Sequence, residues 1–262
     1  MDAQVLSQKA HKASRVTPGR ALFGASALLA WTGALMAAVM LVPHPAVAVL
    51  AGVLYTVPLI SFWEFMVHGV MYHGKGLPGM KGVVRIHVAG HHHHIFPPSR
   101  YVQDGPYAFM RFRAPREPWR MSDNALDNAL TQWAQIGLHF IVGVPAILGP
   151  AWLITHDVTF LLSALVTLAF VSWLLAYVHG VIHTPRDRWI EGHRWFQWLD
   201  RHHYIHHIDY QANVNFLLPL CDVLFGTLKM KLTEEEAARH PTFEQAKPMA
   251  KDIVRPAVEQ AS

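Results

Sequence analysis

Cysteine and charge are both scarce in this chain of 262 residues, which holds a single cysteine and only 15% charged residues. The lone Cys221 excludes an intramolecular disulfide, and it also excludes zinc ribbons and iron–sulfur clusters, which need several thiolates. Low charge beside 52% hydrophobic residues argues against an ordinary soluble domain. The balance of 22 Lys and Arg against 18 Asp and Glu is too even to suggest a nucleic-acid partner.

Long apolar runs stand where charges are missing. A membrane-spanning helix needs about 20 apolar residues, and two runs of this kind contain no charged side chain. Another run follows the first of these after a Pro-containing turn, so that the two form a helical hairpin. One more run is interrupted by prolines and polar residues, which are tolerated where neighbouring helices satisfy them. The sequence therefore predicts an all-helical membrane protein with four spans, at about residues 21–42, 46–67, 133–154 and 158–178.

The placement of Lys and Arg orients these spans. Basic loops stay on the cytoplasmic side of a membrane, and the basic residues lie before the first span, between the second and third, and after the fourth. We therefore expect a cytoplasmic N-terminal segment (1–20), an integral membrane domain (21–232) with a cytoplasmic histidine-rich helical cap, and a cytoplasmic tail (233–262) containing an exposed helix and a loose end. Aromatic and basic residues alternate over 189–199, which suits either an interfacial helix or a partly buried helix of the cap.

Ten of the 19 histidines fall into four clusters. Two clusters begin near the cytoplasmic ends of the second and fourth spans, and the other two follow in the cytoplasmic segments, so all four can meet at one face of the membrane. The clusters are His68 and His73; His87, His91 and His92; His179 and His183; and His203, His206 and His207. Residues three or four apart share a helix face, so we expect chelating pairs at His87/His91 and His179/His183 and within the last cluster. The spacing of five between His68 and His73 requires the helix to be ending there.

These clusters predict a metal centre. Imidazole is the commonest metal-binding side chain and suits Zn, Fe, Cu and Ni. A mononuclear site takes about four protein ligands, so ten histidines fit two ions better than one. We do not expect His11, His44, His139, His156 or His240 to bind metal, and the spacing leaves His193 and His202 undecided.

The four clusters occur in the strings WEFMVHGVMYH, HVAGHHHHIFPPSR, YVHGVIH and DRHHYIHHIDYQANVNFLLPLCDVLFGTL. Together, on a scaffold of membrane hairpins, they resemble the fatty acid hydroxylase and sterol desaturase superfamily of membrane histidine-box oxygenases. The resemblance covers residues 46–229 and is strongest to the fatty acid 2-hydroxylase branch. The second string departs from the family pattern, because three residues rather than two separate His87 from His91.

The resemblance implies a non-haem di-iron centre held by the ten histidines. Such a centre would use dioxygen and two electrons to hydroxylate a C–H bond of a fatty acyl or sterol-like lipid, and zinc is able to replace iron during purification. The chain lacks the haem-binding His-Pro-Gly-Gly string of a fused cytochrome b5. The electron donor would then be a separate ferredoxin or cytochrome b5-like protein. The membrane would be the inner membrane of a bacterium or the endoplasmic reticulum of a eukaryote.

Several polar residues near the clusters are candidates for holding the ligand imidazoles through their second ring nitrogen, as is usual at metal sites. Glu64 lies one helical turn before His68, although it also suits a charge emerging at the membrane interface. The other candidates are Asp200, Asp209, Asn215 and Asp222. The segment 95–128, rich in proline and aromatic residues, would either cover the site or serve as a plain connection.

Three other functions compete with lipid hydroxylation. A desaturase would share every metal ligand, so sequence does not separate it from a hydroxylase. A metal carrier would line a pathway with polar residues inside several spans, and the first and fourth spans hold no ionisable residue. A zinc hydrolase needs an open coordination position and a general base rather than ten imidazoles.

Overall fold

A computed structural model describes residues 16–73, 84, 87–88, 91–93, 96–102, 143–185 and 188–247. All of the regular structure in these residues is helical. Three helices are long and apolar enough to cross a membrane: Pro18–Leu41, Pro45–Tyr72 and Val158–His183. Large apolar side chains such as Leu29, Leu41 and Phe170 are more than half exposed, as expected where helices face lipid. The prediction of an all-helical membrane protein is thus confirmed in its general form.

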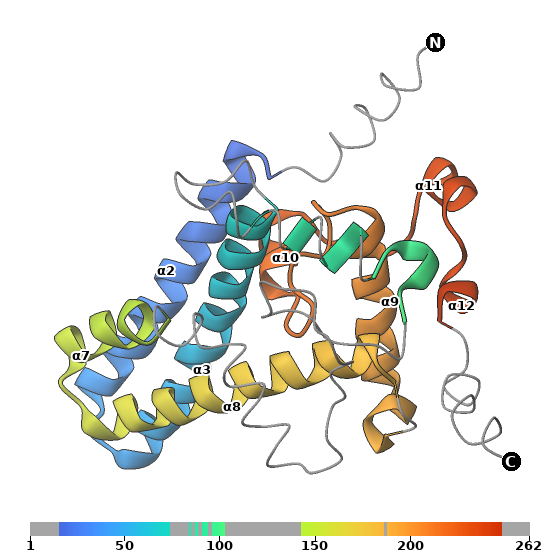
Figure 1. Ribbon diagram of the computed structural model, residues 1–262. Helices are drawn as coiled ribbons and strands as arrows, with labels where there is room; N and C mark the ends of the chain where they lie inside the picture. Colours follow the sequence, from blue (N-terminus) through green and yellow to red (C-terminus); the bar gives the residue numbers. More distant parts are fainter. Residues whose placement is uncertain are drawn as a thin grey trace, which may run out of the picture.

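The first two helices form the predicted hairpin. Helix α2 (Pro18–Leu41) begins at Thr17, whose hydroxyl accepts a hydrogen bond from the backbone of Arg20. Helix α3 (Pro45–Glu64) begins after a three-residue connection and continues without a break into the π-helical segment η1 (Phe65–Tyr72). In Figure 1, α2 and α3 run side by side and α8 (Val158–His183) crosses them.

Helices α3 and α8 approach closely because small residues line their contact. A Cβ placed on Gly52 would lie 2.7 Å from the Cβ of Ser163 and 2.8 Å from the carbonyl oxygen of Phe160. The Ser163 hydroxyl donates to the carbonyl of Val49 at 2.7 Å. Helix pairs in membranes associate through such small residues and hydrogen bonds. This contact fixes the two helices whose C-terminal ends carry histidines.

The predicted third span, at 133–154, is not confirmed, and residues 133–142 lie outside the described part of the chain. The described part forms η5 (Val144–Leu148) and α7 (Gly149–Thr155). Together they reach about 18 Å at 1.5 Å per residue, which is short of the roughly 30 Å hydrocarbon core. Helix α8, by contrast, extends beyond the predicted end at residue 178 and so includes His179 and His183.

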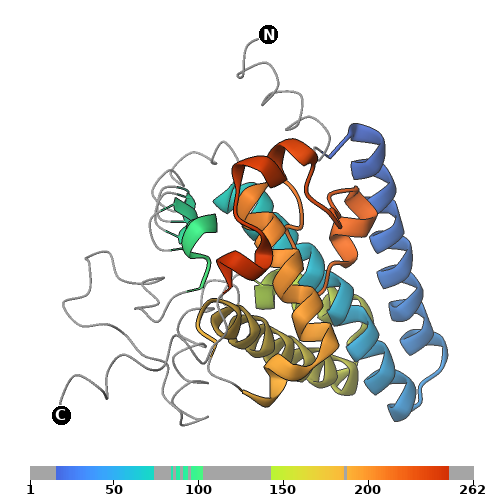
Figure 2. The ribbon, with the colours of Figure 1, turned by 90° about the vertical axis from the view of Figure 1, so that its right-hand side faces the viewer.

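The remaining described helices lie on the side of the molecule toward which the C-terminal ends of α3 and α8 point (Figures 1 and 2). These are η3 (Pro98–Arg100), η6 (Trp189–Gly192), α9 (Arg194–Ile208), α10 (Leu220–Phe225), α11 (Glu234–Arg239) and α12 (Phe243–Ala246). Gly226, at φ +78°, ends α10 in the left-handed conformation that glycine adopts readily. Helix α10 packs against α2, where Phe225 leaves no room for a side chain at position 24.

Candidate metal centre

The structure brings the four histidine clusters together at the ends of α3 and α8. Nine of the ten predicted histidines form two groups whose ring nitrogens lie within 4.8 Å of one another inside each group, and both groups consist of histidines alone. The first group contains His68, His73, His87, His92 and His206, and the second contains His91, His183, His203 and His207. The tenth, His179, places its Nε2 atom 3.1 Å from Nε2 of His203 and so joins the second group.

The Nε2 atoms of the first group converge. His87 Nε2 lies 3.1 Å from Nε2 of His68 and 3.0 Å from Nε2 of His73. His92 Nε2 lies 3.1 Å from the same atom of His87, and His206 Nε2 lies 3.1 Å from that of His73. Five rings from three separate stretches of chain therefore aim the same nitrogen at one point.

The second group is built around His203. Its Nε2 atom lies 3.1 Å from Nε2 of His179, of His183 and of His207. Nε2 of His91 is buried without a hydrogen-bond partner, although the His91 ring centroid lies 4.9 Å from that of His183. The two groups adjoin, since the ring centroid of His92 in the first group lies 4.2 Å from that of His207 in the second.

Helix geometry explains which histidines share a group. In η1 the backbone N–H of His73 donates to the carbonyl of His68 at 3.1 Å, and this five-residue turn puts the two rings together. His87 likewise shares a group with His92, so the predicted pair His87/His91 is wrong: these two residues belong to different groups.

On α9, His203 and His207 are four residues apart and share the second group, whereas His206 faces the first. Helix α9 therefore supplies ligand candidates to both groups. The predicted pair His179/His183, on α8, lies together beside His203.

Backbone carbonyls orient four of the rings through Nδ1. In the first group, Nδ1 of His68 donates to the carbonyl of Val214 at 2.7 Å, and Nδ1 of His206 donates to that of Ala212 at 2.8 Å. In the second, Nδ1 of His183 and of His207 donate to the carbonyls of Tyr101 and Phe96 at 2.8 and 2.9 Å. A proton held at Nδ1 leaves Nε2 with a bare lone pair, which is the usual arrangement of a metal-binding histidine.

Burial keeps these imidazoles neutral. It lowers the pKa of His203 and His207 well below the usual value, with neighbouring histidines adding to the effect. It lowers the pKa of His206 to about 4, against the hydrogen bond to Ala212, which raises it. Neutral imidazole is the form that binds a metal.

The donor set fits a metal ion better than a set of hydrogen bonds. His203 Nε2 has three Nε2 neighbours at 3.1 Å, but one N–H can donate to only one of them. With metal–nitrogen bonds of about 2.1 Å, ligands at right angles would be about 3.0 Å apart and tetrahedral ligands about 3.4 Å apart. The observed separations of 3.0–3.3 Å in the first group lie in this range. The buried histidines could therefore hold metal.

Glu64 supports the chain segment beside the first group. Its buried carboxylate accepts hydrogen bonds from the Asn215 side chain at 3.1 Å and from the backbone N–H of Phe216 at 3.0 Å. The Asn215 side chain also donates to the carbonyl of Ser61 at 2.7 Å. These bonds fix residues 214–216 against α3, and with them the carbonyl of Val214 that accepts from His68.

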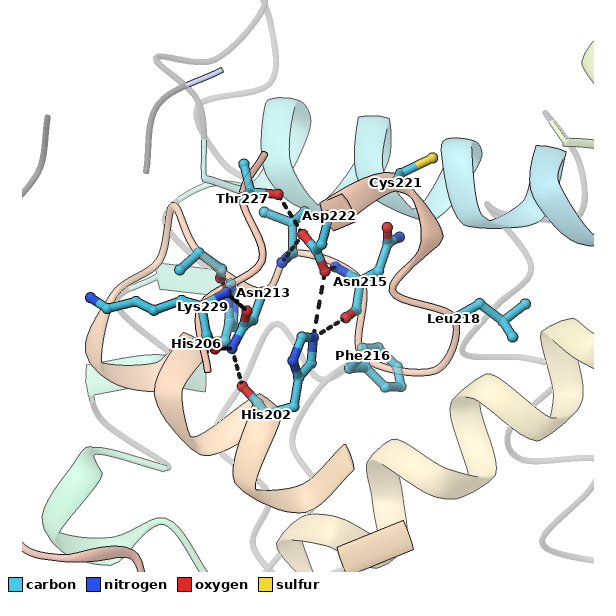
Figure 3. A network of polar contacts seen from close by, with 12 residues as sticks. His202, His206, Asn213, Asn215, Phe216, Leu218, Cys221, Asp222, Thr227 and Lys229 are labelled. Atoms are coloured by element: carbon cyan, nitrogen blue, oxygen red, sulfur yellow. Dashed lines mark hydrogen bonds and ion pairs between the residues drawn. The ribbon is translucent and has the colours of Figure 1, made fainter. Parts of the chain in front are cut away.

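Asp222 holds the same segment from the other side (Figure 3). Its fully buried carboxylate accepts from the backbone N–H groups of Val214 and Asn215 at 2.8 and 2.9 Å and from the Thr227 hydroxyl at 2.6 Å. His202 lies beside it, with Nε2 2.7 Å from the Asn215 carbonyl and 3.5 Å from Asp222. His202 thus serves the frame of the site, and the structure places it in neither histidine group.

Asp200 and Asp209 form ion pairs with lysines. Asp209 pairs with Lys229 at 2.7 Å. The carboxylate of Asp200 pairs with Lys247 and accepts from the Tyr101 hydroxyl at 3.2 Å. Tyr101 is completely buried and its ring lies 5.0 Å from that of His183, so Asp200 touches the second group through this tyrosine.

Four supporting residues were not identified from sequence. Ser61 and Thr227 look like ordinary polar residues until the fold places them, and Tyr101 lies outside the histidine strings. Asn213 was the one whose residue type offered a sequence signal. It adopts the left-handed conformation at φ +52°, which asparagine tolerates better than most residues. Its side chain bridges the carbonyls of His202 and Lys229 at 3.0 and 2.8 Å.

The other described histidines lie outside both groups. His44 caps the start of α3, and His156 ends α7 in the left-handed conformation. His193 precedes α9, and His240 follows α11. His11 and His139 fall outside the described residues.

Comparison of the chain with protein-family models, curated proteins and solved structures gives no match.

Proposed function

We propose that this protein is a membrane-bound non-haem di-iron oxygenase that hydroxylates a C–H bond of a fatty acyl or sterol-like lipid. The observation that carries the proposal is the convergence of ten histidines, nine of them buried and His73 partly buried, into two adjoining groups at the ends of apolar, membrane-length helices. The histidine-string resemblance supplies the reaction class. A position at the end of membrane-spanning helices suits a substrate that arrives through the bilayer.

The donor set favours two redox-active ions over one hydrolytic ion. Five imidazoles per ion exceed the four ligands of structural zinc and the three of catalytic zinc. A hydrolase also needs a general base, whereas the buried carboxylates of Glu64 and Asp222 already accept hydrogen bonds from backbone N–H groups. A carrier would need polar groups along its spans, and helix α2 offers no ionisable side chain beyond Arg20 in its first turn.

Two bound irons would supply the activation of dioxygen, and the chain would hold and shield them. His68, His73, His87, His92 and His206 would hold one ion, and His91, His179, His183, His203 and His207 the other. Phe96 stacks on His183 with ring centroids 4.1 Å apart, and Phe216 lies 4.8 Å from His179. These apolar rings exclude water from the second group, which protects a reactive centre from side reactions.

In this proposal the centre faces the cytoplasm, as the basic loops indicate. Electrons come from a separate ferredoxin or cytochrome b5-like donor. The protein then resides in a bacterial inner membrane or in the endoplasmic reticulum.

Labelled dioxygen tests the reaction. The reduced, iron-loaded protein is supplied with ¹⁸O₂ and a membrane lipid extract, and the products are analysed by mass spectrometry. One labelled oxygen in a lipid product supports hydroxylation, whereas loss of two hydrogens without label identifies a desaturase. Product formation should be abolished in His206→Ala and retained in the control His156→Asn, because asparagine keeps the left-handed backbone at that position.

A further inference from the structure

The two histidine groups are supported by different parts of the chain. His68 and His206 of the first group donate to the carbonyls of Val214 and Ala212, in the loop fixed by Asp222 and Glu64. His183 and His207 of the second group donate instead to the carbonyls of Tyr101 and Phe96. The segment 96–102 therefore orients the second group, so whatever fixes this segment controls that group.

The C-terminal segment 241–247 lies over this part of the structure. In Figure 2 the C-terminal helices lie beside α9, and α12 packs against η3. The Tyr204 hydroxyl donates to the carbonyl of Pro241 at 2.5 Å. Arg201 on α9 pairs with Glu244 at 2.8 Å, and its guanidinium lies 4.5 Å from the centre of the Phe243 ring. The sequence predicted an exposed helix and a loose end for the tail from residue 233; α11 has no buried residue, but residues 241–247 are docked.

Lys247 connects this segment to the second histidine group. Its ammonium pairs with the buried carboxylate of Asp200, and the Tyr101 hydroxyl lies 3.0 Å from the backbone carbonyl oxygen of Asp200 and 3.2 Å from that carboxylate. The carbonyl of the same tyrosine accepts from Nδ1 of His183. Burial lowers the pKa of Lys247 to about 8, which leaves its ammonium mostly charged at neutral pH. The contacts thus run from Lys247 through Asp200 and Tyr101 to His183.

We propose that residues 241–247 form a clasp that positions the second histidine group for metal binding while leaving the first group unaffected. Lys247 is its main positioning residue, acting through Asp200 and Tyr101 on His183. The inference rests on the proposed two-metal site and adds that its two halves depend on separate supports. Partners that orient metal ligands typically contribute about 10- to 100-fold in metal affinity.

Anaerobic titration with Fe²⁺ tests the clasp in the detergent-solubilised full chain. Wild type should bind two equivalents. Lys247→Met should bind one equivalent as tightly as wild type and the other about 10- to 100-fold more weakly. Lys247→Arg, which keeps the charge, should restore much of the lost affinity. The matched control Arg239→Ala removes an exposed ion pair with Glu235 on α11 and should bind like wild type.

A second variant covers the case in which Lys247→Met fails to fold. Phe243→Leu keeps an apolar side chain but loses the ring beneath Arg201, and it should weaken the same equivalent to a smaller extent. Thr227→Val removes the 2.6 Å hydrogen bond to Asp222 and should weaken the other equivalent instead. A double variant of Lys247→Met and Thr227→Val should then weaken both.

The outcomes separate the clasp from the proposed function. If wild type binds two equivalents and both clasp variants bind them with wild-type affinity, the clasp is refuted and the two-metal site stands. Equal weakening of both equivalents in a clasp variant also refutes it. If wild type binds fewer than two equivalents, the two-metal site fails and the clasp fails with it.

Discussion

Replacing Asp222 with alanine should destabilise the protein strongly even without metal. The carboxylate is fully buried and accepts from two backbone N–H groups, of Val214 and Asn215, which cannot turn to other acceptors. Each buried donor left without a partner costs about 1 to 3 kcal/mol, so the two together give about 2 to 6 kcal/mol. The Thr227 hydroxyl adds less, because it can rotate.

Thermal unfolding of the metal-free protein in detergent measures this loss. For a chain of this size each kcal/mol lowers the unfolding midpoint by about 2 to 4 °C, so Asp222→Ala should lower it by at least about 4 °C. The control Glu234→Ala, at an exposed position of α11, should change the stability by no more than about 0.5 kcal/mol. A midpoint for Asp222→Ala within about 2 °C of wild type would refute the argument that this carboxylate fixes the loop.

Three further predictions concern acid, helix packing and topology. As the pH falls from about 6.5 toward 4, the metal-free protein should lose stability. The reason is that His206 takes up a proton in the unfolded chain but not in the native protein, where its pKa is about 4. A thermal unfolding midpoint at pH 5 equal to that at pH 7 would contradict this. Gly52→Ala should lower the free energy of unfolding by about 1 to 3 kcal/mol, because the added methyl group overpacks α3 against α8. The control Gly33→Ala, where a Cβ would meet nothing within 4 Å, should not destabilise the protein. Equal thermal unfolding midpoints for the two variants would show that the helices separate freely. Cysteines introduced at Ser99 and His156 should be labelled in intact cells only at position 156, and the reverse pattern would overturn the cytoplasmic assignment.

The fold was predictable where a helix is long and uncharged. The hairpin and α8 follow from apolar length alone, because the bilayer leaves the backbone few alternatives to a helix. The run at 133–154 is interrupted by polar residues and prolines, and its described part is a short helix. Whether this segment crosses the membrane depends on how it packs against the neighbouring helices, which the local sequence does not specify.

The histidines of the site were predictable, but their arrangement was not. Spacing rules assume 3.6 residues per turn. They fail at His68/His73, where a five-residue turn brings the rings together, and at His87, which shares a group with His92 rather than with His91. The carbonyls of Val214 and Tyr101 orient ligand candidates, yet backbone atoms leave no mark in a sequence. The docking of the C-terminal segment depends in the same way on partners far along the chain.

Counting iron in the anaerobically purified protein tests the central claim most directly. The protein is loaded with ⁵⁷Fe²⁺, freed of excess metal and analysed by elemental analysis together with Mössbauer spectroscopy. The two histidine groups predict about two iron ions per chain, with nitrogen-rich coordination, and loss of iron in His206→Ala or His203→Ala but not in His156→Asn. One ion or none in the wild-type chain, or full iron content in both histidine-group variants, would contradict the account.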